Sequence, residues 1–293
     1  MNTLSNRTLA SPSHLTRNRF LQDCQLHLQS HRLELPTIPE VSYKIRKIIN
    51  DENANSSKIA RVVQIDPSIT ARLIKIANSP LFRGRKTIES CPEALTRLGL
   101  KSAQNIITVF SMKSVFKAKS AKINQEMIEL WKHSSYVAAI SAVMAHRIPG
   151  FDPDRAMLAG LIHDIGVVPI LIHADEHPDL IDKTEDLDET IQLFRARMGV
   201  DIIRRWDFPD DFEETIVHAE DWYRNDARAL NYSDIVMIAQ LHSFIGTVDF
   251  KSLPPIGELP VYQKMADYLS ASDVISILDN AKSEIEDLWT MLS

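Results

Sequence analysis

Apolar residues recur at intervals of three and four along most of this chain, and this spacing constrains its fold more than any other feature. Two early segments carry the pattern clearly: Val41, Ile45, Ile48 and Ile49, and then Ile69, Leu73 and Ile76. On an α-helix such positions form one apolar face. Glycine is scarce, with 8 residues among 293, and runs of Val, Thr and Tyr typical of strands are few. The chain is therefore predicted to be all-α.

Several helix ends can be placed from local chemistry. In Asp66-Pro67, Asp can cap a helix and Pro suits its first turn. Residues 90–93 (SCPE) have the pattern of a capping box, and Gly99 is expected to end the helix that this box opens. Further helices are predicted at 123–148, 153–172, 188–206, 210–224 and 231–247, with a final pair at 261–269 and 272–292. Residues 249–260 are rich in Pro and are predicted to form a loop.

The predicted organisation has three parts. Residues 1–30 are an N-terminal extension that is partly disordered or helical, because they are polar with few apolar anchors. Residues 31–248 form the main domain, and a polar stretch near residues 117–122 divides it into parts 31–118 and 119–248. Residues 249–293 add C-terminal helices.

Charge and composition exclude some classes of function. The net charge of −6 and the lack of a Lys/Arg block argue against a general nucleic-acid binder. The N-terminal residues have no apolar segment of the signal-peptide type, and no apolar stretch is long enough to span a bilayer. Cys24 and Cys91 match no metal-binding or redox spacing. We therefore expect a cytoplasmic protein with reduced thiols.

The pair His163-Asp164 lies inside the apolar run 159–166 (AGLIHDIG). A buried, unpaired carboxylate is costly, and a bound divalent metal would remove that cost. His133, on the buried face of a predicted helix, and Asp234, near the start of another, are further candidate ligands. This mixed nitrogen and oxygen set suits Zn, Fe, Mn, Co or Ni in preference to Ca.

Each member of this set also has a purely structural interpretation. A lone buried His is more often a packing residue than a ligand, and Asp234 by itself would complement a helix dipole. No single helix enforces the separations between His133, His163 and Asp234. From the residues alone, the metal and packing interpretations both stay open.

A family resemblance adds to this reading. The ordered segments are 35–39 (LPTIP), 66–73 (DPSITARL), 77–80 (ANSP), 94–99 (ALTRLG), 160–166 (GLIHDIG) and 206–209 (WDFP). Together with His133 and Asp234, they resemble the HDOD domain, the HD-related output domain of bacterial signalling proteins. HDOD domains are related to the HD superfamily of metal-dependent phosphohydrolases. The resemblance covers roughly residues 30–245.

The resemblance implies an all-α fold in which an N-terminal helical part leans on a multi-helix HD-like core. It also implies a regulatory or signalling setting. For the site, it implies one divalent transition metal, held by His133, His163, Asp164 and Asp234 with His218 nearby.

The chain departs from the family pattern at two points. Arg195 stands where related domains often carry a His, and Arg stays protonated and cannot ligate a metal. Near His218, only one His stands where a pair is common. A two-metal site is therefore not expected. Arg195 has two interpretations. It is a solvated helix residue, or its guanidinium lies near the pocket, where it would offset the charge of Asp164 or bind a phosphate. Lys132 is a second candidate for phosphate binding.

Two hypotheses of function follow. The first is a regulatory protein that binds a signalling protein partner or a small phosphorylated ligand, with little or no catalysis. The alternative is a one-metal phosphohydrolase or phosphodiesterase acting on a nucleotide or another phosphate ester. There, a metal-bound water would attack, Asp164 would be a ligand or proton acceptor, and Arg195 or Lys132 would stabilise phosphoryl charge. The remaining histidines, including His173 and His177, match no ligand pattern and are predicted to be surface or packing residues.

Overall fold

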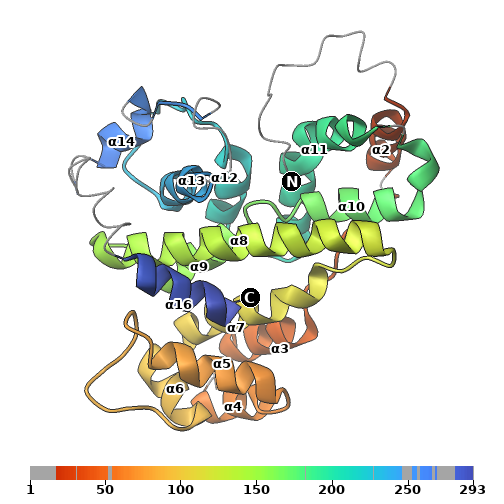
Figure 1. The fold of residues 1–293 in the computed structure, drawn as a ribbon. Helices are drawn as coiled ribbons and strands as arrows, with labels where there is room; N and C mark the ends of the chain where they lie inside the picture. Colours follow the sequence, from red (N-terminus) through yellow and green to blue (C-terminus); the bar gives the residue numbers. More distant parts are fainter. Residues whose placement is uncertain are drawn as a thin grey trace.

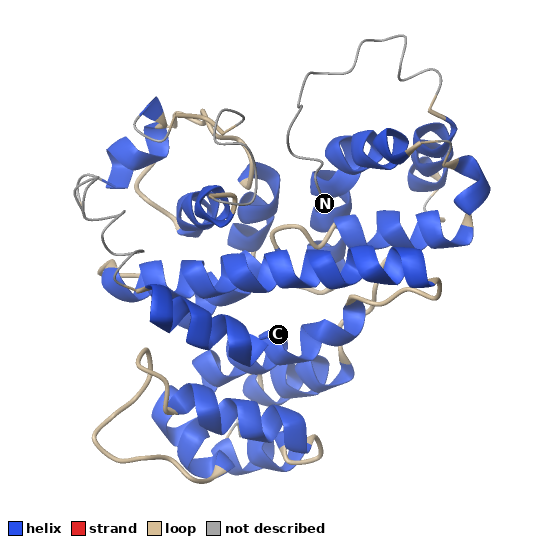
Figure 2. Ribbon diagram, in the orientation of Figure 1, coloured by secondary structure: helices blue, strands red, loops and turns tan. Residues whose placement is uncertain are grey.

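A computed structural model describes residues 18–30, 32–51, 55–181, 183–226, 228–245, 253–255, 258–265, 268 and 281–292. Across these residues the regular structure is helical, and no strand is present among them (Figure 2). The prediction of an all-α fold is confirmed. The expectations for residues 1–17, and for most of 246–280, concern segments outside the described residues.

The helices that follow one another from residue 40 to residue 112 lie below the long central helix in Figure 1. They are α3 (Glu40–Ile49), α4 (Ser56–Val63), α5 (Pro67–Ala77), α6 (Cys91–Leu98) and α7 (Leu100–Met112). The predicted caps are present: the Asp66 carboxylate accepts the amide of Ser68 at 2.9 Å, and Pro67 opens α5. Gly99 separates α6 from α7 with a φ of +77°, a conformation that favours glycine.

The central helix α8 (Ala121–Arg147) runs across the molecule, and α9 (Pro153–Ile162) packs along it (Figure 1). Gly160 permits this close approach, since a Cβ there would lie 2.9 Å from Ala138 Cα and 2.8 Å from Ser141 Oγ. The other core helices are α10 (Val167–Glu176), α11 (Thr184–Arg205), α12 (Asp210–His218) and α13 (Tyr232–Ser243). Short 3-10 turns, Lys113–Val115 and Pro178–Leu180, follow α7 and α10.

The prediction of one continuous helix over 153–172 is wrong. The chain turns between Ile162 and Val167, where the amides of Ile165 and Val167 bond back only three residues, at 3.0 Å each. Gly166 lies directly against the backbone of α11, because a Cβ on it would approach the carbonyl oxygen of Arg195 to 1.8 Å. Both flanking helices are apolar, so hydrophobic spacing alone could not reveal the break. This turn carries the His163-Asp164 pair.

The helix α2 (Arg19–Gln29) docks on α10 and α11, on the opposite side of α8 from α3 (Figure 1). Phe20 and Cys24 are buried on its inner face. Asn18 caps the helix and also donates from its side-chain amide to the Asp186 carbonyl at 2.8 Å. The chain then crosses back, and the Pro36 carbonyl accepts a hydrogen bond from the indole of Trp206 at 2.9 Å.

The last described helices are α14 (Pro260–Met265) and α16 (Lys282–Leu292). α16 lies against both α8 and α5. Trp289 Nε1 donates to Ser135 Oγ at 3.1 Å, and Arg147 pairs with Glu284 at 2.9 Å. α16 therefore links the central helix to the lower group of helices.

One described stretch, Pro153–Glu176, is long and apolar enough to cross a membrane by length and composition alone, with a mean hydropathy of 1.7. It comprises α9, the turn and α10, and 89% of its most apolar window is buried inside the molecule. Core helices have the same composition, so this finding is weak evidence for a span.

Candidate metal centre

The turn after α9 brings three of the predicted ligands together. His133 comes from α8, His163 directly follows α9 as its C-cap, and Asp164 is the next residue. The distance from His163 Nε2 to Asp164 Oδ2 is 3.2 Å, and that from His133 Nε2 to the same oxygen is 3.9 Å. One ligand atom from each of the three side chains lies within 4.8 Å of the others. This spacing is compatible with one shared ion.

The orientation of His163 is fixed by its backbone. Its Nδ1 lies 2.7 Å from the Gly160 carbonyl, which can only accept, so Nδ1 carries the proton. Nε2 is then the ring nitrogen that faces Asp164 Oδ2, at 3.2 Å. It is buried and makes no hydrogen bond within the described structure. A metal-ligating His commonly donates its second ring nitrogen to a carbonyl in this way.

Asp164 divides its two oxygens between different partners. Oδ1 accepts a hydrogen bond from Arg195 Nη1 at 2.5 Å, whereas Oδ2 faces the two imidazoles. The other terminal nitrogen of Arg195 pairs with Glu220 at 2.6 Å. Arg195 is therefore not a solvated residue: it offsets Asp164, one of the alternatives considered from the sequence. Glu220 was missed, because nothing in its local sequence marks it as the partner of a residue on another helix.

The electrostatics keep the potential ligands in their binding forms. Burial, reinforced by His163, lowers the pKa of His133 to about 4, although Asp164 opposes the shift. Burial would raise the pKa of Asp164, but His163 and Arg195 outweigh it and hold that pKa well below its ordinary value. Burial alone would lower the pKa of Arg195, but its two carboxylate partners raise it. At neutral pH the group thus combines a neutral His133, an ionised Asp164 and a permanent cation.

An aromatic side chain covers part of this group. The Phe244 ring stacks on His133, with 5.5 Å between centroids and an interplanar angle of 7°. Trp222 contacts Phe244 edge-on at 6.4 Å. Phe244 follows α13 directly, so the end of that helix contributes to the wall of the site. The sequence analysis did not single out Phe244.

The structure does not bring Asp234 into this group. Its carboxylate pairs with Arg224, lies 3.5 Å from Lys264 Nζ, and accepts the amide of Asn231 at 3.1 Å. With Asn231 it forms the capping box of α13, where the carboxylate faces the helix N-terminus. The helix-start interpretation of Asp234 therefore describes its position better than the ligand interpretation does.

His218 and Lys132 also lie apart from the three converging side chains. His218 Nδ1 is 3.2 Å from the carboxylate of Asp221, at the exposed end of α12. Lys132 is half-exposed and pairs with Glu129 on its own helix at 2.9 Å. Neither contributes an atom to the described ligand atoms that converge within 4.8 Å, so their roles as a nearby ligand and a phosphate-binding residue stay predictions.

The residues present fit one divalent transition metal. They supply two imidazole nitrogens and one carboxylate oxygen, a mixed set suited to Zn, Fe, Mn, Co or Ni. The Nε2 of His163 is the observation that most favours an ion, because it is buried without a hydrogen bond and faces the Asp164 carboxylate oxygen at 3.2 Å. The Arg195 cation lies beside Asp164 and therefore disfavours a second ion at this carboxylate.

Comparison with known sequences agrees with the resemblance. The sequence model of the HDOD domain matches residues 35–222. Over 214 residues the chain is 22% identical to an uncharacterized protein of Treponema pallidum (strain Nichols). This alignment covers 65% of the chain and 40% of the relative, so the chain spans less than half of that protein.

Three solved structures share the fold. A protein of Shewanella amazonensis SB2B, named for a proposed metal-dependent phosphohydrolase, aligns at a TM-score of 0.79 and 23% identity, covering 94% of this chain and 99% of that one. An HDOD domain protein of unknown function from Geobacter sulfurreducens aligns at 0.66 and 22%, with 94% and 97% covered. A protein of Marinobacter aquaeolei VT8, named for proposed signal transduction, aligns at 0.62 and 17%, with 99% and 68% covered. At these identities the likeness establishes the fold.

Proposed function

Because the chain belongs to the HDOD domain family, we propose that it is a regulatory signalling protein that holds one metal ion and acts by binding. His133, His163 and Asp164 would be the ligands of a single divalent transition metal. The partner would be another signalling protein or a small phosphorylated ligand. The names of similar proteins, which include proposed signal transduction, support this setting.

The observation that carries the proposal is the pairing of Arg195 with Asp164. In hydrolysis, Asp164 would need one oxygen for the metal and a second, free oxygen to accept a proton. Here, one of its oxygens already accepts a charge-assisted hydrogen bond from a guanidinium, which is itself held by Glu220. Asp234 is neutralised in a similar way by Arg224 and Lys264. Carboxylates paired with fixed cations suit a binding protein better than a hydrolase that uses them in proton transfer.

The alternative function is a one-metal phosphohydrolase, and one observation favours it. Three protein ligands leave further coordination positions open, as in catalytic metal sites. A bound ion would there lower the pKa of a water ligand and polarise a phosphate ester. Arg195 would act only on Asp164 in that reaction, since both of its terminal nitrogens are paired within the protein.

The deciding experiment measures metal content and turnover together. The untagged chain is incubated with Zn²⁺, Mn²⁺ or Fe²⁺ under reducing conditions and desalted, beside His163→Ala. The control is His146→Ala, which removes an exposed His in the last turn of α8. We expect His163→Ala to hold about one ion per chain fewer than the unchanged chain and the control, and none of the three to hydrolyse phosphodiester or nucleotide substrates. Metal-dependent hydrolysis that His163→Ala abolishes would establish the alternative. A chain that binds none of these metals at this centre would remove the metal from both proposals.

A further inference from the structure

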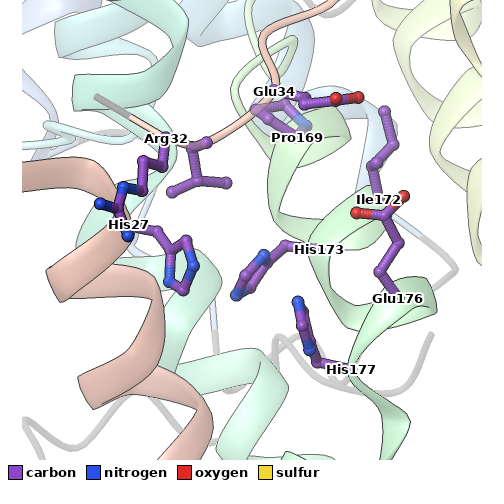
Figure 3. A pocket seen from close by; sticks show the side chains of 9 residues that line it. His27, Arg32, Glu34, Pro169, Ile172, His173, Glu176 and His177 are labelled. Carbon is purple, nitrogen blue, oxygen red and sulfur yellow. The ribbon is translucent and has the colours of Figure 1, made fainter. Parts of the chain in front are cut away.

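A second group of imidazoles lies where α2 meets α10. Asp23 and His27 are one turn apart on α2, whereas His173 is on α10 and His177 follows its last residue. Figure 3 shows the rings of His27, His173 and His177 facing one another beside a pocket of about 230 Å³. The prediction that His173 and His177 are ordinary surface or packing residues does not explain this convergence.

The distances suit a metal ion. His173 Nε2 lies 2.6 Å from Asp23 Oδ2, and His27 Nδ1 lies 3.2 Å from the same oxygen. His27 Nδ1 also donates to the Asp23 carbonyl at 3.0 Å, so an ion bound at Nδ1 would displace that proton. Around a tetrahedral Zn²⁺ with nitrogen and oxygen ligands, neighbouring ligand atoms are about 3.4 Å apart. The His27–Asp23 pair is already close to that value, and His173 would need to move less than about 1 Å. The ligand atoms of all three lie within 4.8 Å of one another.

His177 is within reach as a fourth ligand. Its ring centroid is 4.6 Å from that of His173 and 6.2 Å from that of His27. Its backbone is held, because its amide donates to the His173 carbonyl at 3.0 Å and its carbonyl accepts from the Leu180 amide at 3.1 Å. Ligation by His177 would therefore rely on rotation of its side chain. A carboxylate and three imidazoles form a donor set typical of zinc.

A simple hydrogen-bonded pair does not account for the group. The bond between Asp23 and His173 satisfies those two side chains, but two more imidazoles crowd around them. If the rings were protonated they would repel one another, and burial already lowers the pKa of His173 although Asp23 opposes the shift. A divalent ion would hold all of them in the neutral form, as metal ligation requires.

We propose that Asp23, His27 and His173 bind a divalent transition-metal ion of the zinc class, with His177 as the fourth ligand, and that this ion fastens α2 to α10. The two ligand pairs come from distant parts of the chain, since Asp23 and His173 are 150 positions apart. α2 also precedes residues 35–222, which match the HDOD domain. The ion would therefore couple the N-terminal helix to the family domain. This site is independent of the centre at His163.

The test uses the untagged full chain, stripped of metal with a chelator, in a His163→Ala background that removes the other centre. Zn²⁺ is titrated calorimetrically. We expect one Zn²⁺ per chain, and adding His27→Ala should weaken its affinity by at least about 10-fold, because even the loss of an outer-shell partner weakens metal sites by that factor. The matched control is His218→Ala, which removes a half-buried His that pairs with Asp221 at 3.2 Å and belongs to neither converging group among the described residues. It should leave the affinity unchanged.

A second readout follows α2 itself. Zn²⁺ should slow amide hydrogen exchange in Arg19–Gln29 of the His163→Ala chain, and His27→Ala should abolish that protection. His27 is partly exposed, and Asp23→Asn, a smaller change, provides a second variant if His27→Ala unfolds. The site is refuted if the His163→Ala chain binds no Zn²⁺, or binds it equally well after both substitutions. Binding without protection of α2 would refute the fastening role.

Discussion

Replacing Gly166 with Ala should separate α11 from the turn that carries His163 and Asp164. A Cβ at this position would lie 1.8 Å from the Arg195 carbonyl oxygen and 2.5 Å from the Gly199 amide nitrogen. Both are backbone atoms, so no side-chain rotation can relieve the clash. Ordinary contact begins near 3.4 Å, which means that α11 must retreat by about 1.6 Å.

The cost can be estimated from known overpacking. Inserting a methyl group into a packed core costs about 1–3 kcal/mol, and a clash with rigid backbone belongs at the upper end. We expect a loss of about 3 kcal/mol, which lowers Tm by roughly 6–12 °C in a chain of this size. The retreat of α11 also carries Arg195 away from Asp164, so the charge pair weakens at the same time.

Urea unfolding followed by circular dichroism measures this loss. The matched control is Gly84→Ala, because the Cβ there would meet only the flexible end of the Arg97 side chain, at 3.2 Å. That change should alter the free energy of unfolding by less than about 0.5 kcal/mol. Equal stability of the two variants would refute the argument that close backbone packing at Gly166 holds the turn.

Three further predictions concern charge. Arg195→Met should lower the free energy of unfolding of the metal-free chain by about 3–5 kcal/mol, because it leaves Asp164 as an uncompensated buried charge. Saturating Zn²⁺ should restore part of this loss, and urea unfolding with and without metal tests both statements. Asp234→Asn should cost about 1–3 kcal/mol through its lost pairing with Arg224 but keep the bound ion, and loss of that ion in metal analysis would place Asp234 among the ligands. Burial and two nearby glutamates raise the pKa of Asp188 to about 6, so its ionisation opposes folding, and the free energy of unfolding should fall as pH rises from about 4 to 6. Asp188→Asn should therefore raise Tm at pH 7.5 and have little effect at pH 4, and thermal scans at the two pH values test this.

Local chemistry predicted much of the fold. Asp66 and Gly99 act at helix ends as their residue types suggest, because capping depends on neighbours in sequence. The break at residues 163–166 could not be predicted in this way. It depends on the fit of Gly166 against α11, a contact between segments that are distant along the chain.

The same distinction between local and long-range contacts applies to the predictions for the candidate metal centre. His133, His163 and Asp164 converge as the family resemblance implied, and Arg195 lies on Asp164. Asp234 pairs instead with a cation ten positions earlier and with one from α14, and a ligand pattern defined by residue type cannot reveal such competition.

The second histidine group did leave a trace in the sequence. Asp23 and His27 are four positions apart, and so are His173 and His177, which places each pair on one face of a helix. Either pair alone is common. Only the docking of α2 on α10 brings the two together, and no periodicity in the sequence predicts that docking.

The remote docking of α2 also has a consequence for how the chain acquires its structure during synthesis. Asn18, at the start of α2, bonds to Glu189, which lies 171 positions later. At 5–20 residues per second, a ribosome needs roughly 10–30 s to produce that partner. Throughout this interval the face of α2 that bears Phe20 and Cys24 has no surface to cover it. α2 is therefore synthesised early but can dock only late. Until α10 and α11 have been synthesised, the exposed apolar face of α2 is a site at which the nascent chain could aggregate.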